Sequence, residues 1–179
     1  MYYKTILSSP VGELTLASDG ENLIGLWLEN QKYHGGKIAG ELHEKNELAI
    51  FERTKEWLSD YFADKKPDCK KLPLAPIGSV FQQSVWEILC EIPYGEVITY
   101  GDIAKEIAKR QGKTQMSAQA VGGAVGHNPI SIIIPCHRVV GTNGSLTGYA
   151  GGIKTKTYLL EFEGADITKL WIPKKGTAL

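Results

Sequence analysis

The sequence has too few cysteines, and the wrong spacing of them, for a disulfide scaffold or a zinc site. Cys69, Cys90 and Cys136 form an odd set without a CxxC pair. A small secreted domain uses an even set at framework spacings, so a disulfide-stapled fold is not expected. The four histidines are scattered and do not stand at metal-ligand spacings, which argues against zinc. We expect no metal and no cofactor, and any cysteine chemistry must use a single thiol.

Long apolar runs and a net charge are also absent. The longest apolar stretch surrounds residues 132–134, far short of the roughly 20 residues that a membrane helix needs. The first residues have no signal-peptide pattern, so we expect a cytoplasmic, intracellular protein with no membrane partner. With 20 basic and 20 acidic residues, the formal net charge is zero. This balance excludes histone-like binding of nucleic acid and leaves room only for a local basic surface.

Residues 1–79 have the pattern of a small α/β domain that ends in a linker. Residues 46–63 carry apolar side chains at near-helical spacing, which predicts a helix covering a sheet. Residues 64–79 contain paired lysines and three prolines, which resist both helix and central strand. Turn residues separate three runs with strand-like patterning. The strands are predicted over 3–7, 14–16 and 23–28.

Residues 80–179 change to helical patterning and form the second expected domain. Capping-box sequences predict helices that begin after Ser79 and Thr99, and Ser117 is suited to cap a third. The last two of these helices, joined by a polar turn, have the pattern of a helix-turn-helix unit, although an ordinary αα-hairpin has it too.

The helix predicted after Ser117 is unusually rich in small residues. Its adjacent Gly122 and Gly123 cost about 2 kcal/mol relative to alanine. Tight packing against another helix, or close approach of a nucleic acid, would offset this cost, and the sequence leaves both open. Between residues 97 and 138, five basic residues stand against two acidic ones. That excess is compatible with phosphate contact and equally with a solvated helix surface.

The segment around Cys136 carries the strongest chemical signal. A β-branched run at 132–134, predicted to be a buried strand, is followed by Pro135, which prevents helix continuation. His137 and Arg138 next to the thiol supply positive potential, which favours the nucleophilic thiolate. Cys69 and Cys90, by contrast, fit inert core positions.

Glu163 stands in the last turn predicted for the final helix, just before Gly164. A carboxylate there opposes the helix macrodipole by about 0.3–1 kcal/mol. Such a carboxylate is either an ordinary surface residue or one that holds a cation or orients His137.

These features resemble the O6-alkylguanine-DNA alkyltransferases, also called methylated-DNA–protein-cysteine methyltransferases. The block Ile-Pro-Cys-His-Arg-Val at 134–139 is similar to the signature of that family, and four further blocks follow the family order. The resemblance is specific over 80–164 and only architectural over 1–79. The other blocks are Tyr-Gly-Glu-Val-Ile-Thr-Tyr at 94–100, Ala-Val-Gly-Gly-Ala at 120–124, Asn-Pro at 128–129 and Tyr-Ala-Gly-Gly at 149–152.

The resemblance implies a fold, an activity and a partner. The fold would be an N-terminal α/β domain, with a ribonuclease-H-like antiparallel sheet plus helix, followed by a mainly α domain with a winged-helix-like helix-turn-helix. The activity would be single-turnover DNA repair, in which an alkyl group moves from O6 of guanine, with O4 of thymine as a second candidate, to Cys136. The partner would be double-stranded DNA containing O6-alkylguanine, bound through its minor groove with the base flipped out, and no obligatory protein partner is implied.

The resemblance also implies a role for each of five residues. Cys136 would be the acceptor thiolate, and His137 would deprotonate it through a bridging water. Glu163 would orient that histidine, as in other Cys-His-carboxylate sites. Asn128 would brace the turn before the active segment, and Tyr100 would donate a proton or hydrogen bond to the departing guanine.

A second set of residues would contact DNA or the flipped base. The small-residue helix over 118–126 would enter the minor groove, backbone groups of Cys136, Val139 and Ala150 would read the guanine edge, and Tyr149 would line the pocket. Gln119 departs from the family pattern, which commonly has an intercalating arginine there, so weaker binding is expected. The whole predicted set is Ala118, Gln119, Ala120, Gly122, Arg138, Val139, Tyr149 and Ala150.

Three other functions use the same features. A Cys-His hydrolase or amidase would turn over through an acyl-enzyme. A non-catalytic protein that binds alkyl lesions would not need the acceptor, and its relatives lack the cysteine found here at 136. A redox-sensing thiol would need a resolving cysteine, and none stands near Cys136 in the sequence.

Overall fold

The computed structural model describes residues 1–174, so residues 175–179 of the expected C-terminal domain lie outside the described residues. The contacts divide the chain into two compact units. The first holds Met1–Ile77 together with Pro129–Ile133, and the second holds Gly78–Asn128 and the chain from Ile134 onward. The return of residues 129–133 to the first unit differs from the expected division at residue 79. It arises because this segment bonds to a strand of the N-terminal sheet.

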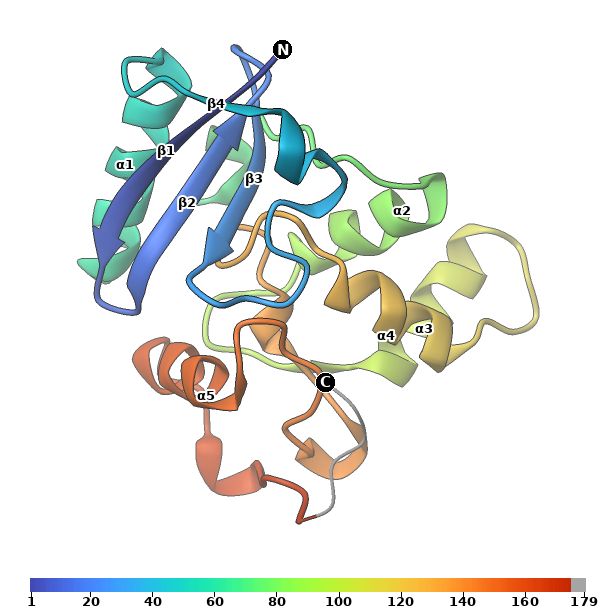
Figure 1. Cartoon of the computed structure of the whole chain (residues 1–179). Helices are drawn as coiled ribbons and strands as arrows, with labels where there is room; N and C mark the ends of the chain where they lie inside the picture. Colours follow the sequence, from blue (N-terminus) through green and yellow to red (C-terminus); the bar gives the residue numbers. More distant parts are fainter. Residues whose placement is uncertain (175–179) are drawn as a thin grey trace. The chain divides into compact units, whose positions relative to one another are not determined.

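The N-terminal unit is a four-stranded sheet with one long helix. The strands lie in the order β3-β2-β1-β4, and α1 packs against β2 and β3 (Figure 1). The three predicted strands and the predicted helix are confirmed. A short fourth strand, which pairs parallel to β1, was not predicted. The elements are β1 (Tyr2–Ser9), β2 (Gly12–Ser18), β3 (Leu23–Leu28), η1 (Gly36–Glu41), β4 (Leu42–Glu44), α1 (Ala49–Phe62) and η2 (Cys69–Lys71).

Strand β3 is buried at all six of its positions. One edge pairs with β2, and the other edge is covered by two separate segments of the chain. The Leu23 amide donates to Pro73 O at 2.9 Å, and the Leu26 amide donates to Pro129 O at 2.8 Å. These bonds leave little of the sheet edge open to pairing with another chain.

The apolar run at 132–134 is buried, but it is not the strand that was predicted. Only Ile130 forms an isolated bridge, to Leu26, before the chain enters turns. Ile132 has φ 69°, in the left-handed region, which a β-branched residue adopts only when its surroundings hold it there. A short apolar run does not distinguish a strand from another buried segment, and the prolines at 129 and 135 limit regular pairing.

The C-terminal unit is mainly helical. The capping boxes of Ser79 with Gln82 and of Thr99 with Asp102 are both present, and Ser117 caps α4. Helix α4 packs against α2 and α3, and Trp86 Nε1 on α2 donates to Ala124 O on α4 at 2.8 Å. The elements are α2 (Val80–Leu89), β5 (Ile98–Thr99), α3 (Tyr100–Arg110), α4 (Ala118–Gly126), η3 (Cys136–Arg138), β6 (Val139–Val140), η4 (Thr142–Gly144), α5 (Ile153–Phe162) and η5 (Ile167–Lys169).

Strands β5 and β6 form a small parallel pair that positions the site. Ile98 pairs with Val139, and Thr99 pairs with Val140. Since α3 begins directly after β5 and η3 ends directly before β6, this pairing fixes Tyr100 and Cys136 within the same unit. No helix within residues 1–174 has the length and apolar character to cross a membrane.

Candidate active site

Cys136 is the first residue of the short helix η3 and is almost fully buried. Cys136 is 5% exposed, and the neighbouring His137 is 0% exposed. The Cys136 amide donates to Ile134 O at 2.8 Å, which closes a tight turn around Pro135. A reagent must therefore enter the protein, or be inserted into it, to reach this sulfur.

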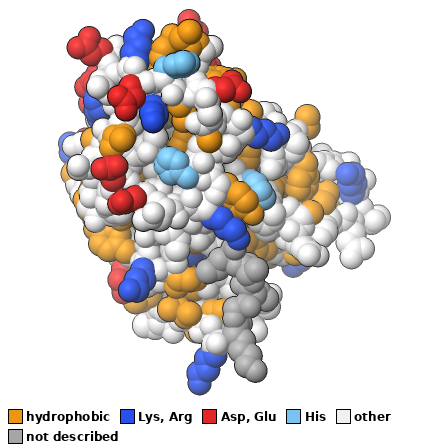
Figure 2. Space-filling model, in the orientation of Figure 1, with side chains coloured by type: hydrophobic (Ala, Val, Ile, Leu, Met, Phe, Trp, Pro, Cys, Tyr) orange, Lys and Arg blue, Asp and Glu red, His pale blue; other side chains and the backbone are white. Residues whose placement is uncertain are grey.

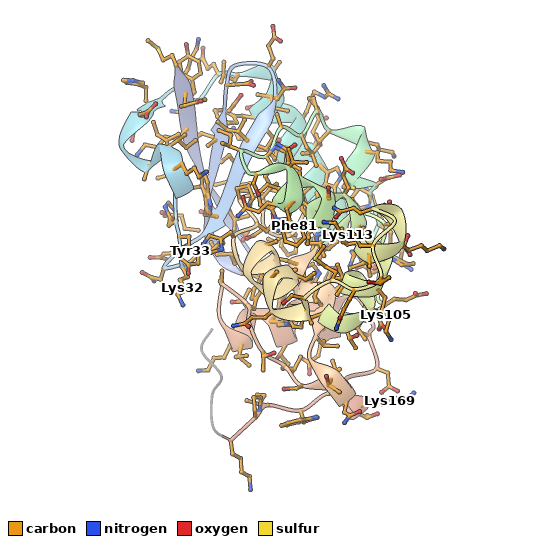
Figure 3. All side chains as sticks on the ribbon, turned by 90° about the vertical axis from the view of Figure 1, so that its right-hand side faces the viewer. Lys32, Tyr33, Phe81, Lys105, Lys113 and Lys169 are labelled. Carbon is orange, nitrogen blue, oxygen red and sulfur yellow. The ribbon has the colours of Figure 1, made fainter. Side chains whose placement is uncertain are left out.

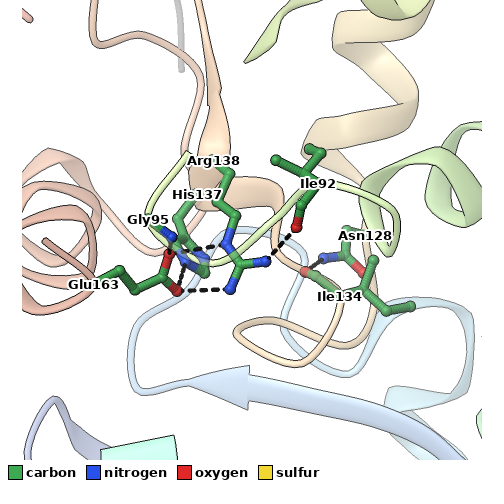
Figure 4. A network of polar contacts seen from close by, with 7 residues as sticks. All are labelled: Ile92, Gly95, Asn128, Ile134, His137, Arg138 and Glu163. Carbon is green, nitrogen blue, oxygen red and sulfur yellow. Dashed lines mark hydrogen bonds and ion pairs between the residues drawn. The ribbon is translucent and has the colours of Figure 1, made fainter. Parts of the chain in front are cut away.

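Glu163, the C-cap residue that follows α5, is the centre of a buried polar network (Figure 4). Its Oε1 lies 2.7 Å from His137 Nε2 and accepts from Arg138 Nη2 at 3.0 Å. Its Oε2 accepts from Arg138 Nε at 2.8 Å and from the Gly95 amide at 3.3 Å. Glu163 thus both holds a cation and contacts His137, so it is not the surface residue that the sequence allowed.

The charge state of Glu163 follows from these contacts. Burial raises its pKa, but the hydrogen bonds and charges of His137 and Arg138 outweigh burial, so the pKa lies below its ordinary value. Glu163 is ionised and can only accept hydrogen bonds. His137 Nε2 must therefore carry the proton that it shares with Glu163.

The other ring nitrogen of His137 has a different environment. Burial lowers the pKa of His137 more than Glu163 raises it, and the charges of Arg138 and Lys156 lower it further. The ring is therefore neutral near pH 7, with its proton on Nε2 and a free electron pair on Nδ1. Nδ1 is buried and has no hydrogen-bond partner in the described part of the chain. It is available to accept a proton.

The thiol of Cys136 is not the resting thiolate that its basic neighbours suggested. Burial raises its pKa, against a hydrogen bond from Asn128 and the charge of Lys156, which lower it. The expectation failed because it counted sequence neighbours as charge partners. Arg138 is paired with Glu163, and His137 is neutral. The sulfur is therefore ionised only when a base removes the thiol proton.

Arg138 was predicted to contact DNA or the base, and the structure gives it other partners. It is 9% exposed. Besides the two bonds to Glu163, its Nη1 donates to Ile92 O at 2.7 Å, and its guanidinium lies 5.6 Å from the ring centroid of Tyr94. A contact between this guanidinium and DNA would require part of the Glu163 network to break.

Asn128 and Tyr100 each donate a hydrogen bond to a backbone carbonyl of the C-terminal unit. Asn128 is 3% exposed, and its Nδ2 donates to Ile134 O at 2.8 Å, spanning the turn that precedes Cys136 (Figure 4). Tyr100 OH donates to Thr147 O at 3.0 Å. Burial and the charge of Cys136 raise the pKa of Tyr100 to about 12, although the bond to Thr147 opposes the rise. This phenol keeps its proton near neutral pH.

The loop before α5 approaches Tyr100 closely. Gly148 has φ 72°, and a Cβ at this position would lie 2.7 Å from Tyr100 OH, so only glycine fits. Tyr149 is 2% exposed, and its hydroxyl has no hydrogen-bond partner among residues 1–174. Its ring meets that of His137 edge-on, with centroids 6.5 Å apart, and Ala150 beside it is half-buried.

Lys156 is a residue of the site that the sequence did not reveal. It is 0% exposed, and its Nζ donates to Val139 O at 2.5 Å and to Thr147 O at 2.8 Å. Val139, whose backbone was expected to read the guanine edge, therefore has its carbonyl bonded to Lys156. In the sequence Lys156 is one of two lysines in a polar stretch that opens α5, which is typical of a solvated helix turn.

The predicted DNA-contacting residues of α4 lie on its exposed face. Ala118, Gln119 and Ala120 are exposed, and Gly122 is half-buried. A Cβ at Gly123 would meet nothing within 4 Å, and one at Gly122 would meet only Tyr100, at an ordinary 3.8 Å. Packing among the described residues therefore does not account for the two glycines.

The local excess of basic residues is smaller on the surface than in the sequence. Arg110 is paired with Glu91 at 2.6 Å and with Glu106 at 2.8 Å, and Arg138 is buried. Lys105 and Lys113, on α3 and on the turn after it, remain exposed (Figure 3). Acidic side chains stand among basic ones on the face of the N-terminal unit drawn in Figure 2. Within residues 1–174, no group of three His, Cys, Asp or Glu residues could hold a metal ion.

Comparison with known families identifies both units. Residues 80–165 match the family described as 6-O-methylguanine DNA methyltransferase, DNA binding domain. Residues 1–76 match the ribonuclease-like domain of the same methyltransferase. The chain belongs to the 6-O-methylguanine DNA methyltransferase family.

Individual relatives agree with this assignment. The methylated-DNA–protein-cysteine methyltransferase of Haemophilus influenzae is 41% identical over 90% of this chain and 86% of its own length. That of Methanosarcina acetivorans is 45% identical over 92% of this chain and 99% of its own. The expected fold class, with a ribonuclease-like domain and a helical DNA-binding domain, is confirmed, as are DNA repair and methylated-DNA–protein-cysteine methyltransferase activity.

Solved structures of relatives have the same fold. The crystal structure of the Mycobacterium tuberculosis O6-methylguanine methyltransferase has a TM-score of 0.75 and 41% identity, and covers 94% of this chain and 98% of its own. A second structure from that organism, solved in complex with DNA, has a TM-score of 0.74 and 39% identity, with 94% of both chains covered.

Proposed function

We propose that this methyltransferase repairs O6-alkylguanine in DNA by moving the alkyl group onto Cys136, once per protein molecule. The observation that carries the assignment is a buried thiol followed directly by a buried, neutral histidine. His137 holds its proton on Nε2 against Glu163 at 2.7 Å, while its Nδ1 is buried without a partner within the described residues. A single water between Nδ1 and the sulfur would complete a route for the thiol proton.

The transfer then proceeds in one displacement. His137 takes the thiol proton through the water, and the sulfur attacks the alkyl carbon. The new S–C bond forms as the C–O6 bond breaks, and the electron pair of that bond stays with guanine. Tyr100 supplies a proton or hydrogen bond to the departing base, for which its hydroxyl must turn away from Thr147 O, its present acceptor at 3.0 Å. The thioether is stable, because a thiolate is a poor leaving group and water does not displace it, so the protein is consumed.

Glu163 and Asn128 act through other residues. Glu163 fixes the orientation and tautomer of His137 and, after proton uptake, balances the imidazolium charge. Arg138 holds Glu163 by two bonds, so we assign it to this network and propose no direct contact with DNA. Asn128 fixes the turn before Cys136 through Ile134 O and lowers the pKa of the thiol by a hydrogen bond.

We propose that α4 enters the minor groove of duplex DNA and that the lesion is flipped into the protein. The burial of Cys136 supports flipping, because the alkyl carbon cannot reach the sulfur while the base stays stacked. The exposed small residues of α4 support a close backbone approach to DNA. Gln119, exposed on this helix, would fill the space left by the flipped base with an amide and no charge.

Intact mass spectrometry tests the assignment directly. The protein is incubated with duplex DNA that contains O6-methylguanine, and the same experiment is run with Cys136→Ser. We expect a mass gain of one methylene on Cys136, one equivalent of repaired guanine per protein, and no gain in the variant. Repair beyond one equivalent would indicate a hydrolase, and binding without mass gain would indicate a lesion sensor. Either result would contradict the proposal.

A further inference from the structure

One turn of the C-terminal unit holds both partners of the buried ion pair between Arg138 and Glu163. This turn, residues 92–96, follows α2, and it contacts the pair through its backbone (Figure 4). The Ile92 carbonyl accepts from Arg138 Nη1 at 2.7 Å, and the Gly95 amide donates to Glu163 Oε2 at 3.3 Å. The cation and the anion are therefore anchored on a single short piece of chain, to which the proposed mechanism gives no role.

The backbone of the 92–96 turn is fixed by its own geometry. The Glu96 amide donates to Pro93 O at 3.1 Å, which closes the turn. Gly95 has φ 79°, as the third position of a type II turn requires, and glycine adopts this value without strain. The turn therefore presents its N–H and C=O groups at defined positions.

A side chain at position 95 would collide with the residue that the turn holds. A Cβ there would lie 2.6 Å from Glu163 O, a backbone atom that cannot rotate aside as the end of a flexible side chain can. The two backbones thus approach as closely as glycine allows. Next to Gly95, the half-buried Tyr94 places its ring centroid 5.6 Å from the Arg138 guanidinium, so a third group of the turn contacts the ion pair.

These contacts fix the carboxylate that meets His137. Glu163 Oε2 accepts from Gly95 and Arg138, and Oε1 accepts from Arg138 and contacts His137 Nε2 at 2.7 Å. The first three bonds depend on the 92–96 turn, either directly or through the guanidinium that Ile92 holds. The last bond sets which ring nitrogen of His137 carries the proton. The place of the turn therefore determines where the histidine finds its carboxylate.

We propose that the 92–96 turn positions the base of the reaction: Gly95 and Ile92 fix the Glu163 carboxylate, and the carboxylate in turn orients His137 for removal of the thiol proton. This inference rests on the proposed role of His137. Gly95 acts through Glu163 and is a positioning residue. A displaced carboxylate would let the Nδ1 electron pair turn away from the proton that it has to accept, and a displacement of about 1 Å can lower a rate about 100-fold.

The bond between His137 and Glu163 can be observed without DNA. Its buried Nε2 proton should give a downfield NMR signal, which His137→Gln assigns by its loss. In Gly95→Ala we expect this signal to move upfield or to vanish through exchange with water, because the added methyl group displaces Glu163. Gly112→Ala is the matched control, since Gly112 has φ 63° and a Cβ there meets nothing within 4 Å. It adds backbone strain without contacting Glu163, so the signal should stay in place.

The rate of methyl transfer should follow the NMR signal. With saturating duplex that contains O6-methylguanine, we expect Gly95→Ala to lower the single-turnover rate constant about 10- to 100-fold, with unchanged affinity for the duplex. Gly112→Ala should react at the rate of the parent protein. A slower rate with an unchanged signal would make Gly95 a residue needed only for folding and would overturn the proposal. Equal losses in the two variants would overturn it as well, because backbone strain alone would then explain them.

A second variant leaves the backbone of the turn intact, so it decides the question even if Gly95→Ala does not fold. Tyr94→Leu removes the ring beside Arg138, and we expect the rate to fall about two- to fivefold, with a smaller upfield movement of the signal. A rate and a signal that both stay unchanged would overturn the proposal. If the signal moves as expected but the parent protein transfers no methyl group to Cys136, the proposed function fails while the positioning of His137 stands.

Discussion

The two compact units bury different kinds of polar side chain. In the N-terminal unit the buried polar side chains are neutral hydroxyls and an amide, namely Thr5, Ser18, Gln31, Thr54 and Ser131. In the C-terminal unit they include four ionisable groups, His137, Arg138, Lys156 and Glu163. A buried ion pair contributes little to stability in comparison with apolar packing. The N-terminal unit therefore avoids the free-energy cost of burying charges. The C-terminal unit bears that cost, because its chemistry requires buried ionisable groups.

The largest expected effect on stability comes from removing the charge at the centre of the C-terminal network. Glu163→Gln keeps the shape of the side chain but leaves Arg138 buried without a counterion. We expect a loss of about 3–5 kcal/mol in the free energy of unfolding, measured by urea denaturation.

The matched control removes a buried neutral group from the N-terminal unit. Gln31 Oε1 accepts from the Leu28 amide at 3.0 Å and from Ser131 Oγ at 2.9 Å. Gln31→Leu leaves these donors unsatisfied and should cost about 1–3 kcal/mol. Equal losses in the two variants would show that the units do not differ in the way described.

The second effect is a pH dependence that the buried network of the C-terminal unit causes. The pKa of His137 is lowered from 6.5, mainly by burial, so below this pH the unfolded chain binds a proton that the folded protein does not. The free energy of unfolding should therefore fall as the pH drops below 6.5, by up to about 1.4 kcal/mol per pH unit. Glu163, whose pKa is also lowered, extends the loss to more acidic pH.

Urea unfolding from pH 8 to pH 5, followed by backbone NMR signals of each unit, measures this effect. His137→Gln is the control, because it removes the histidine and should flatten the slope between pH 6.5 and pH 5. A slope of the same size in this variant would show that another group causes it.

The smallest expected effect separates folding from DNA binding on α4. A Cβ at Gly123 meets open space, so Gly123→Ala should stabilise the protein by about 0.5–1 kcal/mol. The same methyl group would stand between the helix backbone and DNA, and affinity for duplex DNA should fall. Thermal unfolding and fluorescence anisotropy with a labelled duplex measure the two effects.

Gly101→Ala on α3 is the matched control for Gly123→Ala. A Cβ at Gly101 would meet only Thr99 Oγ1, at an ordinary 3.8 Å, so a similar gain in stability is expected with unchanged affinity. If both variants bind DNA as the parent protein does, α4 does not approach DNA through Gly123.

Features that depend on local sequence were predictable. The capping boxes at Ser79 and Thr99 and the three strands of the N-terminal sheet follow from side chains within a few residues of one another, and all were confirmed. Three-residue β4 was missed because it pairs with β1, about 40 residues away, and so short a strand has too few residues to show a period.

Features that depend on distant partners were not predictable. Arg138 stands next to the nucleophile in sequence, yet its charge is bound by Glu163, 25 residues further on. Lys156 has the sequence context of a surface lysine, and only the fold buries it against the carbonyls of Val139 and Thr147. The protonation state of Cys136 was not predictable either, because burial, which the sequence does not show, is the main cause that raises the pKa of its thiol.

The return of residues 129–133 to the N-terminal sheet has a consequence for how the chain can be divided. Two backbone hydrogen bonds hold this segment to Leu26: the Leu26 amide donates to Pro129 O, and the Ser131 amide donates to Leu26 O. The residues that flank the segment, Asn128 and Ile134, are joined by the hydrogen bond that precedes the nucleophile. A fragment that begins at residue 78 would retain the whole catalytic set but lose the strand on which this segment is anchored. Truncation at the linker should therefore loosen the acceptor cysteine even though every residue named in its chemistry is kept.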